Sequence, residues 1–418
     1  LDKCKWYILK GQLCIKSKAE LKDYCAAWQG AIDEALKVEA PKTQADLLIQ
    51  IHKTLSYRRG NPDEISELYA SLLEPINNLY AKKAELGSQV TLSVLWMLVD
   101  LNKRSDQYQI AEKLCEEIIA SVDSSKDMRT LARANVEHIN ILRQLNKQQE
   151  LKAKVNEVVQ RPDVTGGEIS AALDAMLGWN IEGAELDKAI LMLRKAIADN
   201  CLQQDTADSA QYGVVKLLLS ADRLEEALSE ARIYYYTAGN LSGNRGSGAI
   251  SLVVDILKRA DNDLSRVNRF LLYQELGPEG VDKKFGTADD LADILAGVAL
   301  PSDSERNKIF KQAIDESKGE TWRDHCKRAN LNSYLGAYDK SLVELKQAFM
   351  RCPTDQKHLQ NIVDQMTRII VRTTHDQDAA EMTVKYIMYG SAGMDAKQGT
   401  KDDIHNPLPG ILTELAKR

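Results

Sequence analysis

The residues best suited to do chemistry are acidic, and they lie in two loops that share one pattern. The first loop reads GPEGVDKKFGTADDLAD, and the second reads GSAGMDAKQGTKDDIHN. Hard cations prefer carboxylate and carbonyl oxygens on a tight turn that glycine permits. We therefore predict a calcium site in each loop. The ligands would be Asp282, Asp289, Asp290 and Asp293 in the first loop, and Asp395, Asp402, Asp403 and Asn406 in the second.

Helix capping is a second interpretation of the same loops, and it needs no metal. Thr287 and Thr400 are residues of the kind that caps a helix N-terminus. Asp290 and Asp403 follow three residues later, where a carboxylate can reach back to the cap amide. Capping leaves the first aspartate of each loop unexplained, whereas the loops lack the ligand pattern of an EF-hand. Calcium binding and helix capping both stay open.

The loops resemble a G-x-D-G-x-x-G-T-x-D-D-L motif of repeat-rich proteins from planctomycete-like bacteria. The resemblance extends over residues 209–297 and again over 322–410. The acid here follows one residue after the second glycine, which departs from that motif. Many of those proteins are exported, so the resemblance implies a bacterial protein of the periplasm or cell surface. A cytoplasmic protein is the alternative.

Cysteine and histidine give no catalytic or metal signature. The seven cysteines include no C-x-x-C pair, and most lie in apolar stretches typical of buried free thiols. No H-E-x-x-H motif, P-loop, dinucleotide-binding fingerprint or nucleophile elbow is present. We therefore predict that the protein is not an enzyme and requires no cofactor, with calcium in the two loops as the one ion that it could bind.

Composition argues against two kinds of partner and favours one kind of fold. A net charge of -6 gives no basic excess to follow a nucleic-acid backbone. No run of about 18 apolar residues is present, so no membrane span is expected. Helix-forming residues dominate and only nine prolines occur, which predicts an all-α chain with essentially no sheet.

The predicted helices recur at a regular interval. Small residues occupy equivalent positions at Ala111, Ala189, Ala227 and Ser341. Their separations of 78, 38 and 114 residues are close to two, one and three times 38. A single helical hairpin cannot bury its apolar face, whereas stacked hairpins bury a continuous core.

One stretch, YLGAYDKSLVELKQAFMRCP at residues 334–353, resembles a tetratricopeptide-repeat (TPR) hairpin. It has small residues where two helices cross, an aromatic wedge and a proline at its exit. The resemblance implies a right-handed superhelical solenoid of about ten antiparallel hairpins, with a closed toroid as the alternative. It also implies a concave groove lined by the first helix of each hairpin.

A longer sequence unit occurs twice in the second half of the chain. Residues 209–297 and 322–410 match in order, and each copy ends in an acidic loop. We therefore predict three parts. Residues 1–205 form N-terminal TPR-like repeats, 206–300 form the first copy, and 301–418 form the second copy.

Aromatic residues give two further expectations. Tyr234, Tyr235 and Tyr236 are consecutive, so they point in different directions on a helix. We expect most of this aromatic surface to pack in the core and at least one ring to be exposed, where it could anchor a partner. The tryptophans are scattered and are expected to be core wedges: Trp6, Trp28, Trp96, Trp179 and Trp322.

Together these features predict a non-catalytic scaffold for protein–protein interaction or assembly. Its partner would be a protein or peptide in the concave groove, or further copies of the chain, and not a nucleic acid. One alternative is a helical-toroid enzyme that acts on saccharides, against which the low aromatic content of 6% argues. Another is a self-assembling subunit of a surface or filamentous structure.

Overall fold

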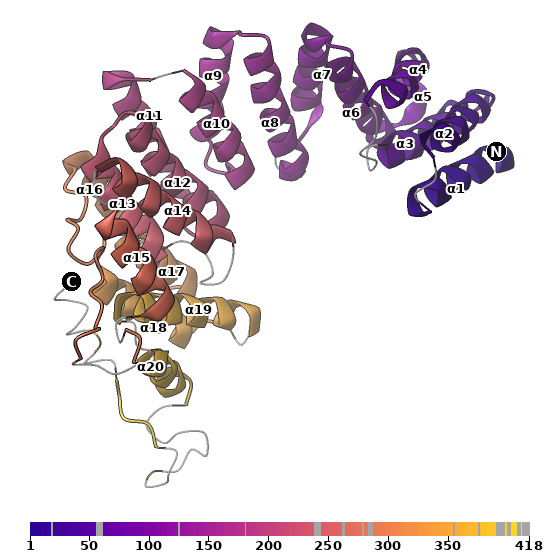
Figure 1. Ribbon diagram of the computed structural model, residues 1–418. Coiled ribbons are helices and arrows are strands. Elements are labelled where there is room, and N and C mark those ends of the chain that lie inside the picture. Colours follow the sequence, from indigo (N-terminus) through magenta and orange to yellow (C-terminus); the bar gives the residue numbers. More distant parts are fainter. Residues whose placement is uncertain are drawn as a thin grey trace. The chain divides into compact units, whose positions relative to one another are not determined.

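The computed structural model of the chain is built from helices (Figure 1). It describes residues 1–17, 20–55, 62–123, 126–179, 181–237, 244–260, 264–277, 280–282, 287–353, 356–374, 377–389, 398, 403–407 and 411. Within these residues there are 20 helices and no strand, which confirms the predicted all-α fold. Each helix packs mainly on its neighbours in the chain, as in a solenoid of helical hairpins.

The chain divides into two compact units, Leu1–Val155 and Asn156–Arg418. The first contains α1 (Asp2–Lys16), α2 (Leu21–Leu36), α3 (Pro41–Leu55), α4 (Pro62–Ala81), α5 (Lys83–Leu86), α6 (Ser88–Arg104), α7 (Tyr108–Ser121) and α8 (Met128–Gln144). Helix α9 (Gln148–Val159) spans the division. The second continues with α10 (Gly166–Gly178), α11 (Gly183–Asn200), α12 (Gln204–Ser220), α13 (Leu224–Thr237), α14 (Asn244–Ala260), α15 (Ser265–Leu276), α16 (Ser304–Glu316), α17 (Trp322–Tyr334), α18 (Tyr338–Arg351), α19 (Gln356–Thr374) and α20 (Gln377–Tyr389). Residues 205 and 206, where a boundary was predicted, both lie inside α12 of the second unit.

A left-handed residue recurs at the turn inside the hairpins. Asp106, Asn146, Asp222 and Gly336 all have φ between 53° and 75°. These residue types adopt positive φ most readily. In each turn the next amide bonds the carbonyl five residues earlier, as Gln107 N–H does to Asn102 at 2.8 Å, which is the Schellman helix end. The four residues are 40, 76 and 114 apart, close to one, two and three times 38.

Ion pairs connect residues that are one repeat apart in the sequence. The two members of each pair are 34 to 36 residues apart, slightly fewer than the repeat length, because their side chains extend toward each other between adjacent hairpins. The pairs are Lys83–Glu117, Lys103–Glu137, Glu112–Lys147, Asp187–Arg223 and Arg194–Glu230.

The core of the first unit begins in the α1–α2 hairpin. Trp28 on α2 is fully buried there, beside Tyr24 and Ile8. Gly11 on α1 provides the space, because a Cβ at this position would lie 2.4 Å from the Trp28 ring. A close helix crossing is therefore filled by one indole.

The second unit contains the duplicated sequence, and its helices match in order and position. Moving the bounds of α13 by 113 residues gives 337–350, and α18 spans Tyr338–Arg351. The same shift takes α15 to 378–389, and α20 spans Gln377–Tyr389. The two copies also pack against each other, because α17 and α19 both contact α13, while α16 contacts α11. The second unit is therefore not a simple open array.

Two aromatic expectations are wrong in part. Tyr234, Tyr235 and Tyr236 are all buried, because α12, α14, α17 and α19 all pack around α13. Trp28 is a core residue as expected, but Trp6 is 55% exposed on α1.

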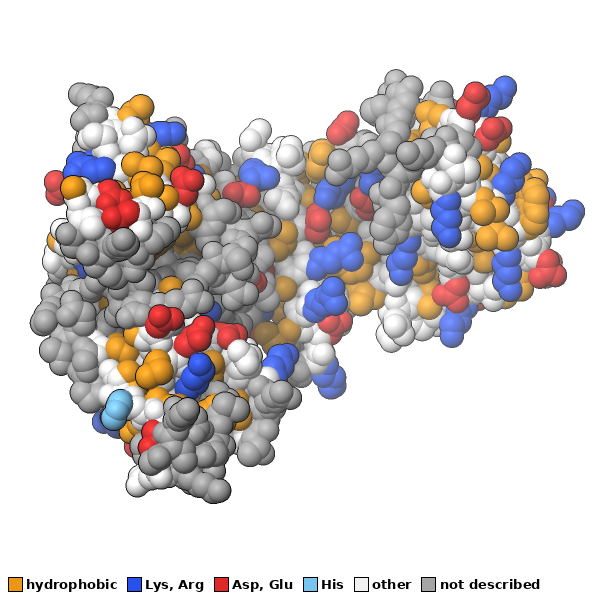
Figure 2. Space-filling model, turned by 60° about the horizontal axis from the view of Figure 1, so that its bottom comes forward, with side chains coloured by type: hydrophobic (Ala, Val, Ile, Leu, Met, Phe, Trp, Pro, Cys, Tyr) orange, Lys and Arg blue, Asp and Glu red, His pale blue; other side chains and the backbone are white. Residues whose placement is uncertain are grey.

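The surface mixes charges of both signs. Figure 2 shows acidic and basic side chains interspersed among apolar ones on the described part of the face that it draws. Among the described helices, none is long and apolar enough to cross a membrane. The described cysteines are free thiols, and five of the seven are buried, as expected.

Candidate functional site

The first acidic loop is closed by its own carboxylate. Asp289 Oδ2 accepts hydrogen bonds from the amides of Val281 (2.6 Å) and Asp282 (3.0 Å), and Asp289 Oδ1 accepts one from the Thr287 hydroxyl (2.7 Å). The Thr287 hydroxyl, followed by the two amides, holds the pKa of Asp289 below its ordinary value. Gly280 is required here, since its φ is +64° and a Cβ would lie 2.2 Å from the Asp289 carbonyl oxygen.

Helix capping by Thr287 is therefore wrong. No helix follows it, because residues 287–303 contain turns and bends but no helix. Capping boxes occur elsewhere in the chain, at Thr165 with Glu168 and at Thr321 with Asp324. In the second loop, Asp403 and Asn406 are described, whereas Asp395, Thr400 and Asp402 lie outside the described residues.

The residues after the loop attach it to two helices. We call residues 293–303 the strap. Asp293 accepts a hydrogen bond from the buried Tyr236 hydroxyl on α13. Arg232, also on α13, donates to the carbonyl of Val298. Asp303 pairs with Arg194 on α11. The strap therefore ties the end of the first copy to the middle of the second unit.

These contacts bear on the calcium prediction without deciding it. Asp289 and Asp293 use their oxygens within the protein, on different partners. In the part of the chain that the structure describes, the only convergent group of metal-type ligands is Glu112, Glu116 and His138, far from the loop in sequence. Calcium binding by the loops stays a prediction.

A buried charge cluster lies where the strap ends. Glu230 on α13 is 1% exposed and accepts hydrogen bonds from Arg194 (2.8 Å), Arg306 (3.0 Å) and Gln211 (2.9 Å). Burial alone would raise the pKa of Glu230, but the charges of Arg306 and Arg194 outweigh it and lower the pKa. Arg306 also donates to the carbonyl of Tyr334 on α17. The cluster therefore joins α11, α12, α13, α16 and α17.

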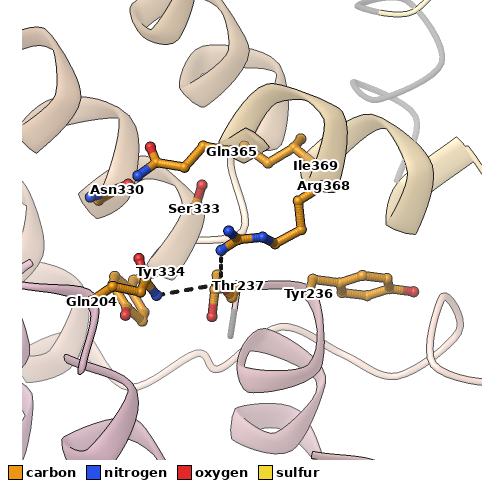
Figure 3. A pocket seen from close by; sticks show the side chains of 9 residues that line it. All are labelled: Gln204, Tyr236, Thr237, Asn330, Ser333, Tyr334, Gln365, Arg368 and Ile369. Carbon is orange, nitrogen blue, oxygen red and sulfur yellow. Dashed lines mark hydrogen bonds between the residues drawn. The ribbon is translucent and has the colours of Figure 1, made fainter. Parts of the chain in front are cut away.

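A small polar cavity lies beside this region, between α13, α17 and α19 (Figure 3). Arg368 on α19 points at the carbonyl of Thr237, to which it donates at 3.2 Å. Gln204 reaches the same carbonyl from α12. The cavity volume of about 20 Å³ has room for about one water. This seam between the copies is therefore packed structure and too small for a substrate.

A larger cavity lies in the first unit and is the better candidate site. Its volume is about 320 Å³, and it is lined by α3, α6 and α8. Helices α6 and α8 each precede a hairpin turn, at Asp106 and Asn146, so they are first helices of hairpins. The lining residues are Ile49, His52, Lys53, Ser93, Trp96, Met97, Val99, Asp100, Lys103, Arg104, Arg133 and Glu137. We call this cavity the groove.

One wall of the groove is an ordered ion cluster. Asp100 accepts hydrogen bonds from His52 Nε2 (2.9 Å) and Arg104 Nε (2.8 Å). The Arg104 guanidinium also lies over the Tyr69 ring, 4.1 Å from its centroid. Burial alone would raise the pKa of Asp100, but the hydrogen bonds from His52 and Arg104 lower it to about 2.

Where α8 meets α6, the groove presents a cation on an aromatic ring. The Arg133 guanidinium on α8 lies 3.9 Å from the centroid of Trp96 on α6. Lys103 is engaged by Glu137, whereas no ion pair is seen for Arg133 among the described residues. An exposed guanidinium over an indole can receive a carboxylate, while the ring beside it receives an apolar group.

The groove offers little for acid–base catalysis. A His–Asp pair can transfer a proton, but here Asp100 is shared with Arg104. The one hydroxyl in the lining, that of Ser93, donates to the carbonyl of Gln89 at 3.1 Å. The arrangement is suited to binding.

Substitution of Asp100 by asparagine tests the ion cluster. The pKa of Asp100 is lower in the folded state than in the unfolded state. The ionised carboxylate therefore stabilises the fold above about pH 4, and this stabilisation is lost as the pH falls toward 2. After allowance for partial exposure, we expect the variant to unfold more easily by roughly 1–2 kcal/mol at pH 7. Urea unfolding should show this difference shrink between pH 5 and pH 3. An unchanged difference at pH 3 would contradict the assignment.

The sequence could not name the groove residues, although a signal is present. Ser93, Met97, Asp100 and Arg104 recur at three- and four-residue steps along one face of α6. Nothing in that spacing distinguishes a groove from an ordinary solvated face. No protein-family model matches the chain, and no curated protein matches it significantly.

Proposed function

We propose that the chain is a non-catalytic interaction scaffold of the TPR type that binds a protein or peptide segment in the groove. The observation that carries the proposal is the placement of an unpaired, exposed Arg133 on Trp96 within a cavity lined by α3, α6 and α8. An array of this kind uses the surface that successive hairpins share for recognition.

The groove also suggests what the segment carries. Its apolar lining includes Ile49, Met97 and Trp96, and its unengaged charge is positive. We infer a segment with an acidic side chain next to an apolar or aromatic one, because the acid would pair with Arg133 and the ring would pack at Trp96. The already paired His52, Asp100 and Arg104 would hold the wall in place.

Selection of short displayed peptides on the full chain tests this function. We expect enriched peptides to combine acidic and apolar residues, and their affinity to fall at least about tenfold in Arg133→Glu, since a paired charge is replaced by a repelling one. Fluorescence anisotropy of a labelled selected peptide measures the affinity. Arg129→Glu is the matched control, because Arg129 is exposed on the same helix and does not line the groove. Equal binding by wild type, Arg133→Glu and Arg129→Glu would contradict the proposal.

A further inference from the structure

Three metal-type ligands converge at the packing of α7 on α8, outside the groove. Glu112 and Glu116 lie one turn apart on α7, and His138 faces them from α8. One ligand atom from each lies within 4.8 Å of the others, and His138 Nε2 is 3.9 Å from Glu116 Oε1. Glu112 and His138 are only 7% and 8% exposed, whereas Glu116 reaches solvent.

The backbone around the three ligands is fixed by packing. Cys115, which lies between the two glutamates in sequence, is fully buried and donates from Sγ to the carbonyl of Ala134 at 3.2 Å. Ala134 is one turn before His138 on α8. The two helices are therefore joined at this level, and the exposed Glu116 side chain can turn toward His138.

A cation already occupies part of this cluster. The ammonium of Lys147 lies 2.7 and 2.8 Å from the two carboxylate oxygens of Glu112. The Lys147 side chain is 37% exposed, so its long stem can swing into water when another cation arrives. The position thus attracts positive charge, and its present occupant is displaceable.

We propose that Glu112, Glu116 and His138 form a binding site for a divalent transition-metal ion, with zinc as the best fit. Imidazole together with carboxylate suits zinc and its neighbours, whereas calcium needs six to eight oxygens. Bonds of about 2.0–2.2 Å place tetrahedral ligand atoms about 3.3 Å apart, so the 3.9 Å gap closes by a small turn of Glu116. Three protein ligands leave a fourth position for water or an external ligand.

Such an ion would join two successive hairpins of the first unit. An ion that binds only the folded state stabilises that state. It would therefore strengthen the packing of α7 on α8 and raise the unfolding temperature. The inference is independent of the groove, since Glu112 and Glu116 do not line it.

Titration of the full chain with Co²⁺ tests the site, with thiols kept reduced. We expect visible d–d bands of four-coordinate cobalt that saturate at one equivalent, disappear on zinc addition, and carry no thiolate charge-transfer band. Zinc should also raise the unfolding temperature of the wild type. Both responses should be lost in Glu116→Gln, which changes an exposed side chain and leaves the core intact.

Two further variants make the test specific. Lys147→Gln should shift the titration midpoint to lower cobalt concentration, because it removes the competing ammonium. Glu117→Gln should bind as the wild type does, since Glu117 lies next to Glu116 on α7 but pairs with Lys83 instead. Equal cobalt spectra and equal zinc stabilisation in wild type and Glu116→Gln would overturn the proposal, as would the absence of any one-equivalent signal.

Discussion

Replacing Glu230 with alanine is expected to lower the free energy of unfolding of the second unit by about 3–5 kcal/mol. Glu230 is the only carboxylate hydrogen-bonded to both Arg194 and Arg306 among the described residues. Arg306 is 1% exposed, so the variant would leave its guanidinium buried beside a second cation. Removing one member of a buried ion pair lowers the free energy of unfolding by much more than the intact pair contributes to it, because the remaining charge is buried without its partner.

Hydrogen exchange followed by mass spectrometry can measure this loss helix by helix. Protection should fall in α11, α13 and α16, whereas α2 in the first unit should be unchanged. Glu226→Ala is the matched control, since Glu226 lies one turn earlier on α13 and makes an exposed pair with Arg223; we expect a change within about 1 kcal/mol. Similar protection in the two variants would show that the cluster does not stabilise the fold.

Acid should weaken the same cluster. The folded pKa of Glu230 lies below its ordinary value, so its contribution is present above about pH 4.5 and is lost as pH falls through the lowered value. The difference in the free energy of unfolding between wild type and Glu230→Ala should therefore become smaller as the pH falls.

Replacing Trp28 with alanine is expected to destabilise the first unit by about 3–5 kcal/mol. The indole is fully buried between α1 and α2, and Gly11 lies directly against it. The small glycine cannot fill the space, so a cavity would remain where the ring was.

Urea unfolding followed by far-ultraviolet circular dichroism measures the change, and Trp6→Ala is the control. Trp6 is 55% exposed on α1, so its removal should cost about 0.5 kcal/mol or less. Equal losses in the two variants would contradict the assignment of Trp28 as the centre of this core.

The fold was predictable because short stretches of the sequence specify its helices and turns. Helix-forming composition predicted an all-α chain, and small residues such as Ala189 and Ala227 marked a 38-residue interval. Multiples of the same interval separate the left-handed turn residues, as the 114 residues from Asp222 to Gly336, because these hairpins end their first helix in the same way.

The first acidic loop and the strap after it show where local signals fail. Thr287 with Asp290 has the same Thr-x-x-Asp spacing as Thr321 with Asp324, yet only the second pair caps a helix. The first pair lies in a loop that ends at Asp293, whose partner is far away in sequence. Tyr236 is 57 residues from its acceptor Asp293. No window of local sequence contains such a contact.

The residues of the candidate site could not be predicted from the sequence. A groove on first helices follows from the repeat pattern, but its chemistry depends on which exposed residues meet. Arg133 and Trp96 come from different helices, 37 residues apart, and neither is distinctive alone. The charge cluster of Glu230 was missed for the same reason, because Arg306 is 76 residues away.

A double-mutant cycle between Arg133 and the acidic residue of a selected peptide tests the binding function most directly. Anisotropy would give the affinities of wild type and Arg133→Glu for the peptide and for its acid-to-lysine form. We predict that the lysine peptide regains binding to Arg133→Glu, with a coupling free energy of at least about 1 kcal/mol. Additive effects of the two changes would show that the peptide does not lie against Arg133, and would contradict the groove as the binding site.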